Sequence, residues 1–261
     1  MRFAWVVLVL AGCGRLNFGG SGATDGGRTD TTTGDGRVTD APGDGVLAST
    51  CGTSGVLACD GFEGSIDPMW TLDTSAGTIA VDTARAYRGT SSAHVHINQL
   101  TSATTNPRAT LYGPAGLPIT GTVYFRVWMY AASPLDSTTY LNQMLNASDV
   151  PGNGISMGSR HGVVTNNDYT GGGYAESTTA FPLDRWTCLQ FQMPSGTQGT
   201  SRVFVDGTEV TDIALATPGT QPVPTHVYIG IEWVGNASSM PATDAWVDEV
   251  IVDSQPTTCA Q

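Results

Sequence analysis

The stretch VYFRVWMY, residues 123–130, alternates apolar side chains with polar or aromatic ones. A period of two is typical of a β-strand with one buried face, because successive side chains of a strand point to opposite sides. One face carries Val123, Phe125, Val127 and Met129, and the other carries Tyr124, Arg126, Trp128 and Tyr130. The sequence therefore predicts a strand that packs its first face into a core and turns its second face outward.

Comparable segments follow along the chain. Residues 226–233 place Val227, Ile229, Ile231 and Trp233 on one face, and residues 186–193 alternate likewise. Residues 201–210 predict a hairpin, because Asp206-Gly207 favours a two-residue turn, and residues 245–253 form the last strand. Gly, Pro, Asn and Asp separate these segments, and no stretch longer than ten residues has a helical period. We therefore expect residues 51–261 to form one all-β domain, a two-sheet antiparallel sandwich.

The first residues have the features of an export signal. Residues 1–12, MRFAWVVLVLAG, join Arg2 to an apolar run that is shorter than the ~20 residues needed to cross a bilayer. Leu10-Ala11-Gly12-Cys13 resembles a lipobox, which predicts a lipid on Cys13 that anchors the protein in a membrane. No aspartate follows the cysteine, so we expect an extracytoplasmic protein at the outer membrane or cell surface.

Residues 13–50 are dominated by Gly, Asp and Thr and cannot form a core. They predict a disordered tether that spans roughly 30–36 Å. The chain has a net charge of −12, and all eleven of its basic residues are arginine. This charge repels nucleic acids and anionic polysaccharides, and no concentrated basic patch offsets it. A nucleic-acid partner is therefore not expected.

Four cysteines remain once the leader is removed, and an even number in an exported chain predicts two disulfides. Three pairings are possible. The short separation of Cys51 and Cys59 favours a local loop between them, which leaves Cys188 for Cys259. A metal site is the alternative, but no C-x-x-C spacing occurs to support it.

Five motifs stand in a recognisable order. They are Cys59-Asp-Gly-Phe-Glu63-Gly64 with Trp70, Tyr87-Arg-Gly89 with Ser91-Ser-Ala-His94-Val95, Arg185-Trp186-Thr-Cys188-Leu-Gln-Phe, Val205-Asp206-Gly207, and Trp246-Val-Asp248-Glu-Val250. Together, over residues 58–259, they resemble the concanavalin A-like jelly rolls of the laminin-G, lectin and glucanase group. The resemblance implies that the first two motifs cover the first three strands and that the last strand pairs with the first.

The resemblance also implies a structural calcium ion between the first and last strands. Asp248 and Glu63 would supply carboxylates, and a backbone carbonyl near Gly89 would complete the oxygen shell. The alternative is that both carboxylates only accept hydrogen bonds from nearby backbone.

In this architecture the concave sheet usually holds the ligand. Sugars bind by stacking on aromatic rings while polar side chains take their hydroxyls. We therefore expect a carbohydrate site on the outward face of residues 123–130 and on neighbouring strands, formed by Tyr124, Arg126, Trp128, Tyr130, Gln190, Gln192, Tyr228 and Glu232. The alternative is that a loop covers Trp128 and Tyr130, which then fill a minor core.

Signals for catalysis are weak. The chain lacks the Glu-x-Asp-x-(x)-Glu run of glucanases, and the adjacent Asp248 and Glu249 should point to opposite faces of a strand. A lyase needs basic residues to neutralise uronates, and a serine hydrolase needs G-x-S-x-G, which is absent. The main hypothesis is a non-catalytic surface lipoprotein that binds carbohydrate or a glycan-bearing partner. The alternatives are a polysaccharide-degrading enzyme of the same fold and a structural cell-envelope interaction module.

Overall fold

The structure is a computed structural model, described here for residues 56–102, 104–113, 120–135, 141–148, 154–171, 173–234, 236–237 and 240–260. For residues 105, 141–148 and 236–237 only the backbone is described. The expected leader, the lipid site at Cys13, the tether and Cys51 lie outside these residues. In the described part of the chain, no helix is long and apolar enough to span a membrane.

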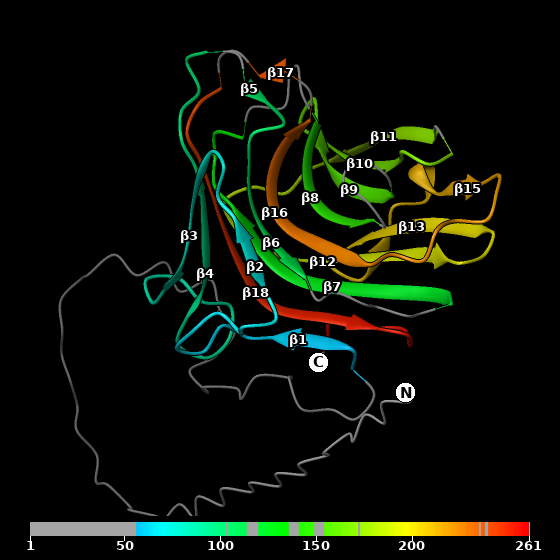
Figure 1. Ribbon diagram of the computed structural model, residues 1–261, viewed down its shortest axis with the longest axis horizontal. Helices are drawn as coiled ribbons and strands as arrows, with labels where there is room; N and C mark the ends of the chain where they lie inside the picture. Colours follow the sequence, from blue (N-terminus) through cyan, green and yellow to red (C-terminus); the bar gives the residue numbers. More distant parts are fainter. Residues whose placement is uncertain are drawn as a thin grey trace, which may run out of the picture. The chain divides into compact units, whose positions relative to one another are not determined.

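Two large antiparallel sheets form the domain (Figure 1). The larger has nine strands, in the order β14 (Thr208–Glu209), β13 (Gly199–Val205), β12 (Trp186–Ser195), β7 (Gly121–Ala131), β18 (Thr243–Asp253), β4 (Ser92–Ile97) and β3 (Gly77–Asp82), with β1 (Ala58–Asp60) paired to β18 and β15 (Leu215–Thr217) to β13. The other has seven, in the order β11 (Gly173–Ala180), β10 (Val163–Asp168), β9 (Ile155–Arg160), β8 (Leu141–Ser148), β16 (His226–Val234), β6 (Arg108–Gly113) and β2 (Thr71–Asp73).

The small elements complete the description. β5 (Thr104–Thr105) and β17 (Asn236–Ala237) form a two-stranded ribbon, and one 3₁₀ turn spans Thr211–Ile213. In Figure 1 both large sheets bend in the same direction, and β16 and β8 follow the inner side of the arc that β7 and β18 draw. The outward face of the seven-stranded sheet is therefore on the inside of the bend.

The core lies between the two sheets and confirms the predicted faces of the main strands. In β7 the side chains of Val123, Phe125, Val127 and Met129 are at most 4% exposed. The apolar faces of β16 and β12 join the same cluster, with Val227, Ile229, Ile231, Trp233, Leu189, Phe191 and Met193. Burial of these side chains stabilises the sandwich, at ~25 cal/mol per Å² of apolar surface removed from water.

Two further predictions, one local and one between distant strands, are confirmed. The hairpin between β13 and β14 turns at Asp206 and Gly207, whose φ angles of +50° and +78° are those of the turn that Asp-Gly favours. The last strand pairs with the first, since Val252 and Val250 of β18 lie opposite Ala58 and Asp60 of β1.

The strand expected at Tyr87-Arg-Gly89 is not formed. These residues belong to the connection between β3 and β4, and β4 begins only at Ser92. The backbone N–H groups of Tyr87 and Arg88 donate to the Asp248 carboxylate rather than to the backbone carbonyls of a neighbouring strand. This connection therefore lies against the outer face of the nine-stranded sheet.

Candidate functional site

The eight residues expected to bind carbohydrate are divided between the two sheets. Tyr124, Arg126, Trp128 and Tyr130 are in β7, and Gln190 and Gln192 are in β12, all in the nine-stranded sheet. Tyr228 and Glu232 are in β16, in the seven-stranded sheet. Both sets alternate with core residues and so lie on the outer faces of their sheets. The expectation of a single site was wrong, because the sandwich separates the two sets.

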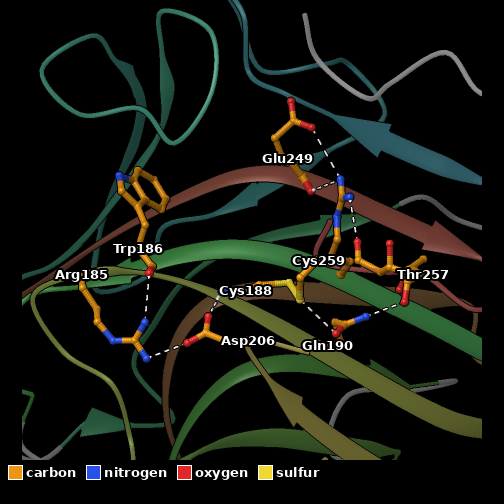
Figure 2. Close-up of a disulfide and its surroundings, with 10 residues drawn as sticks. Arg185, Trp186, Cys188, Gln190, Asp206, Glu249, Thr257 and Cys259 are labelled. Carbon is orange, nitrogen blue, oxygen red and sulfur yellow. Dashed lines mark hydrogen bonds and ion pairs between the residues drawn. A yellow bond between two sulfur atoms is a disulfide. The ribbon is translucent and has the colours of Figure 1, made fainter. Parts of the chain in front are cut away.

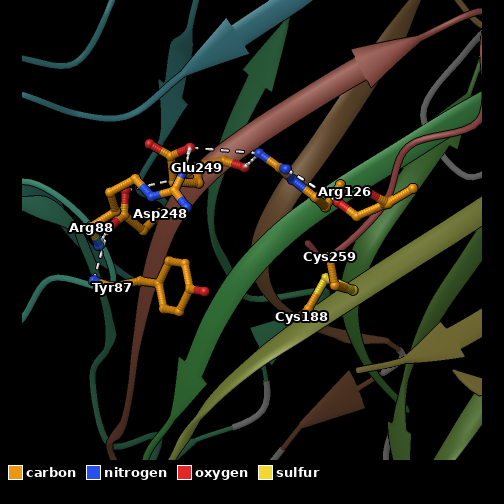
Figure 3. A network of polar contacts seen from close by, with 8 residues as sticks. Tyr87, Arg88, Arg126, Cys188, Asp248, Glu249 and Cys259 are labelled. Carbon is orange, nitrogen blue, oxygen red and sulfur yellow. Dashed lines mark hydrogen bonds and ion pairs between the residues drawn. A yellow bond between two sulfur atoms is a disulfide. The ribbon is translucent and has the colours of Figure 1, made fainter. Parts of the chain in front are cut away.

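Arg126 does not face water. Its side chain is fully buried, and Nη2 lies 3.5 Å from a Glu249 carboxylate oxygen (Figure 3). The guanidinium also donates to the backbone carbonyls of Thr258 and Glu249, at 3.2 and 3.4 Å. Burial lowers the pKa of Arg126, and the Glu249 carboxylate opposes that effect. Arg126 thus ties β7 to β18 and to the C-terminal segment, and it is not positioned to contact a ligand.

Other side chains cover the aromatic rings of β7. The Tyr87 ring stacks on Trp128 with centroids 3.6 Å apart and planes 9° from parallel. The Arg85 guanidinium lies 3.7 Å from the centroid of the Tyr130 ring, which is 7% exposed. Trp246 meets Tyr130 edge to face, with centroids 5.7 Å apart. The structure therefore supports the alternative of a minor core under the β3–β4 connection.

A β-bulge in β18 alters the geometry of Asp248 and Glu249. The register shifts between Asp248 and Ile251, and Glu249 has a φ of +50°. As a result both residues contact Arg88: its backbone N–H donates to Asp248, and its Nη1 lies 3.8 Å from Glu249. The expectation that these carboxylates point to opposite faces, as in a regular strand, was wrong.

Protein N–H and O–H groups donate hydrogen bonds to the carboxylates of Asp248 and Glu63, two of the residues expected to hold calcium. Asp248 accepts hydrogen bonds from the backbone N–H groups of Tyr87, Arg88 and Glu249. Burial nevertheless raises the pKa of Asp248 to about 7. Glu63 accepts from the backbone N–H and the hydroxyl of Thr90, and it lies so close to Gly89 that a Cβ there would collide with it.

The structure thus gives these two carboxylates protein donors, and calcium binding by Glu63, Gly89 and Asp248 stays a prediction. A cation would have to displace those N–H groups from the Asp248 oxygens. Among the residues described, no cluster of three His, Cys, Asp or Glu side chains is arranged to hold a metal ion.

The predicted disulfide between Cys188 and Cys259 is confirmed. It joins β12 to the C-terminal segment, with Cα atoms 5.9 Å apart (Figure 2). The Gln190 amide donates to the carbonyl of Thr257, so side chain and disulfide together fix this segment. Cys59 is also disulfide-bonded, while Cys51, its expected partner, lies outside the described residues.

The outer face of the seven-stranded sheet carries a continuous row of polar and aromatic positions. Residues directly opposite each other in paired strands lie on the same face of a sheet. Successive pairings across β6, β16, β8, β9, β10 and β11 join Tyr112, Tyr228, Asn146, Ser156, Asn167 and Tyr174. A second row joins Arg108, Glu232, Gln143, Gly158, Thr165 and Glu176.

We call this surface the polar face and define it by the described side chains Arg108, Thr110, Tyr112, Ser156, Thr165, Asn167, Tyr169, Tyr174, Glu176, Tyr228 and Glu232. Many of them are buried although they point away from the core: five are at most 8% exposed, namely Thr110, Ser156, Thr165, Asn167 and Glu232. Two buried hydroxyls, those of Thr110 and Thr165, have no hydrogen-bond partner among the described residues, whereas the Tyr169 hydroxyl is within hydrogen-bond reach of the Ser156 and Asn167 side chains. Buried hydroxyls of this kind need a partner from solvent or from a ligand.

Two tyrosines of the polar face, Tyr169 and Tyr174, have raised pKa values and are neutral hydrogen-bonding groups. Burial raises the pKa of Tyr169 to about 12, and the side chains of Ser156 and Asn167 only partly counter it. Burial and the Glu176 carboxylate, which accepts the Tyr174 hydroxyl at 2.6 Å, raise the pKa of Tyr174 to about 12. At the other end of the row the rings of Tyr112 and Tyr228 stack, with centroids 5.3 Å apart.

Charges on the polar face are nearly balanced. Burial raises the pKa of Glu232, and Arg108, whose Nη1 lies 3.7 Å away, partly counters it. Arg160 lies 3.6 Å from Glu176.

The two glutamates of the polar face are far apart. Glu232 and Glu176 are four strand spacings apart, roughly 19 Å, whereas the paired carboxylates of glycosidases are ~5–9.5 Å apart. These two residues therefore cannot act as an acid–base pair on one glycosidic bond.

The sequence identified part of this surface. Tyr228 and Glu232, both expected to bind carbohydrate, lie on the polar face, whereas the other six expected residues do not. Tyr112, Ser156, Asn167, Tyr169 and Tyr174 were missed. The alternation of residues 108–112 was a usable signal for Tyr112, but the short segments 155–160 and 163–168 are rich in small polar residues and alternate poorly.

The arrangement of the strands defines the fold class of the domain. The nine- and seven-stranded antiparallel sheets form a jelly-roll sandwich of the concanavalin A-like type, as the sequence motifs indicated. No protein-family model matches the chain, and no curated protein matches it.

Solved structures give the fold relationship. The chain is similar to "Cellulose induced protein, Cip1", with a TM-score of 0.63 and 18% identity over 77% of this chain and 99% of the other. It is also similar to an endo-β-1,4-glucuronan lyase from the fungus Trichoderma reesei, with a TM-score of 0.59 and 11% identity over 77% and 96%. The receptor-binding domain of botulinum neurotoxin type G matches with a TM-score of 0.52 and 6% identity over 79% of this chain and 49% of that one. At these low sequence identities, the structural similarity shows a shared fold only.

Proposed function

We propose that the domain binds a carbohydrate chain along the polar face. The observation that carries the proposal is the register row that runs from Tyr112 and Tyr228 at one end to Tyr174 at the other. The row spans five strand spacings, about 24 Å, which suits several sugar units rather than one. Aromatic rings at both ends would stack on sugar rings, and the amide and hydroxyl groups between them would bond sugar hydroxyls.

The preferred ligand is a neutral glycan. Arg108 and the neighbouring Arg160 pair with Glu232 and Glu176, and the chain as a whole is acidic, so a polyanion would meet net repulsion. The glucuronan lyase of the same fold acts on a polysaccharide, which supports a carbohydrate ligand in general. The two tyrosines with pKa values of about 12 keep their protons and can donate hydrogen bonds to sugar oxygens.

A second candidate function is polysaccharide degradation centred on Glu232. This buried carboxyl has a raised pKa and shares Arg108 with Asp73, whose carboxylate lies 3.3 Å from the arginine Nε. A carboxyl group with a raised pKa beside a second carboxylate is a combination that glycoside hydrolysis uses. Incubation with neutral and uronate polysaccharides, followed by assays for new reducing ends and unsaturated products, distinguishes this function from binding alone.

We propose in addition that a lipid on Cys13 holds the domain at the outer membrane or cell surface, with residues 14–50 as the tether. Metabolic labelling with palmitate, followed by membrane fractionation, tests this proposal. The native chain should carry the label and sediment with membranes. Cys13→Ser should lose both properties.

A glycan array followed by calorimetric titration of the best ligand tests carbohydrate binding. The sample is the full chain with Cys13→Ser, which removes the expected lipid site. Tyr228→Ala should weaken binding by about tenfold or more, and Asn167→Ala by about fivefold, as expected for one lost hydrogen bond. Tyr124→Ala, which removes a tyrosine on the opposite side of the sandwich, is the matched control and should leave binding of a long chain unchanged. Binding that survives Tyr228→Ala but not Tyr124→Ala would contradict the assignment of the polar face.

A further inference from the structure

A second concave site lies on the opposite side of the sandwich from the polar face. A pocket of about 280 Å³ opens on the outer face of the nine-stranded sheet. Tyr124 of β7, Gln192 of β12 and Phe204 of β13 contribute to its floor, and residues 256–259 form a wall. Its volume is just below the ~300–1,000 Å³ of typical small-molecule sites. Because the pocket is at the lower limit of this range, it could hold only one small ligand.

The wall of this pocket is fixed in place. The Cys188–Cys259 disulfide attaches its end to β12, and the buried Gln190 side chain donates to the Thr257 carbonyl (Figure 2). Arg126 donates to the carbonyl of Thr258. Three separate attachments hold four residues, so the pocket exists before a ligand arrives. A preformed site avoids the entropy cost of ordering a segment on binding.

The lining of the pocket selects an uncharged ligand. None of the described residues that line it carries a charge. Four of them are aromatic; the side chains of Phe125 and Phe191 belong to the core, which leaves the rings of Tyr124 and Phe204 on the outer face. Tyr124 and Gln192 are directly opposite in the β7–β12 pairing, so their side chains share one face. A phenol hydroxyl and a carboxamide can both donate and accept hydrogen bonds. Rings together with such groups fit a small molecule that has an apolar face and several hydroxyls.

We infer that this pocket is a second saccharide site, which takes a single neutral pyranose unit such as a chain end or a branch. The inference is independent of the polar face, because the two surfaces belong to different sheets and share no residue. A domain with both sites can hold two glycan chains at once. On a glycan-covered surface, two weak sites of this kind increase the effective affinity through their linkage.

The test is an NMR titration of the full chain carrying Cys13→Ser with methyl glycosides of glucose, galactose, mannose and N-acetylglucosamine. At least one of them should bind in the millimolar range and shift the resonances of Gln192 and of residues 256–259. Tyr124→Ala should weaken this binding by about tenfold, and Gln192→Ala by about fivefold. Tyr228→Ala is the matched control on the polar face and should leave it unchanged.

Removing the disulfide that attaches the wall gives a second measurement. The double variant Cys188→Ser/Cys259→Ser should bind the methyl glycoside at least tenfold more weakly and keep its binding of a long oligosaccharide. If that variant does not fold, Tyr124→Ala decides the question alone. No shift at the pocket with any of the four glycosides overturns the inference, and so does a shift produced only by p-cresol or indole, which identifies an aromatic ligand instead. If the chain with intact disulfides binds a methyl glycoside at the pocket but no long oligosaccharide, the proposed function is contradicted and this inference stands.

Discussion

Replacing Arg126 with methionine tests the assignment of this residue to the interior. The substitution keeps most of the side-chain volume but leaves the Glu249 carboxylate, 2% exposed, without its nearest cation. Removing one partner of a buried ion pair costs about 3–5 kcal/mol. Arg88 still lies 3.8 Å from Glu249, so the lower end of that range applies. For a domain of about 200 residues, a loss of about 3 kcal/mol corresponds to a fall in Tm of roughly 6–12 °C.

Urea unfolding followed by tryptophan fluorescence, together with calorimetry, measures this loss. The midpoint should fall while the slope m stays constant, because the surface exposed on unfolding is unchanged. Arg202→Met is the matched control: its side chain is 41% exposed and pairs with Glu209 at 2.6 Å, and such surface pairs contribute ~0–1 kcal/mol. The reasoning is refuted if Arg126→Met unfolds within 0.5 kcal/mol of the native chain, or if it stays stable and loses glycan binding.

Three further outcomes follow from the geometry. The pKa of Asp248 is about 7 in the folded protein against 3.8 as its ordinary value, so the folded state holds a proton that the unfolded chain releases between these values. Its contribution to the free energy of unfolding therefore falls as the pH rises from about 4 to 7, and urea titrations at several pH values should show a shallower fall in Asp248→Asn. Removal of the Cys188–Cys259 disulfide, which closes a loop of 71 residues, should cost about 4 kcal/mol when Cys188→Ser/Cys259→Ser is compared with the native chain in urea unfolding; an unchanged midpoint would show that the bond adds no stability. Gly230→Ala should destabilise the domain by about 1–3 kcal/mol, because φ is +141° and a Cβ would lie 2.4 Å from the Ala109 carbonyl; a melting curve like that of the native chain would contradict this steric argument.

Local patterns predicted the strands and their core faces because alternation is a local property. The apolar side chains of residues 123–129 and 227–233 are all buried where the period of two placed them. The Asp206-Gly207 turn likewise depends only on the φ angles that its own two residues adopt. These predictions needed no knowledge of which strands become neighbours.

The site could not be predicted in the same way, because it depends on the order of strands in space. Alternation states that Arg126 points away from the core, but it cannot show that Glu249 and Thr258 cover it. It also cannot assign residues 123–130 and 226–233 to different sheets. The bulge at Asp248 is a further local irregularity that the pattern of apolar residues did not reveal.

The position of β18 affects how the chain can fold. This strand, which ends eight residues before the C-terminus, lies between β7 and β4 and also pairs with β1. Until it has been synthesised, β7 and β4 each have an unpaired edge, and such edges promote aggregation. The two parts of the nine-stranded sheet, β14–β13–β12–β7 and β4–β3, are therefore joined only once β18 has paired with both.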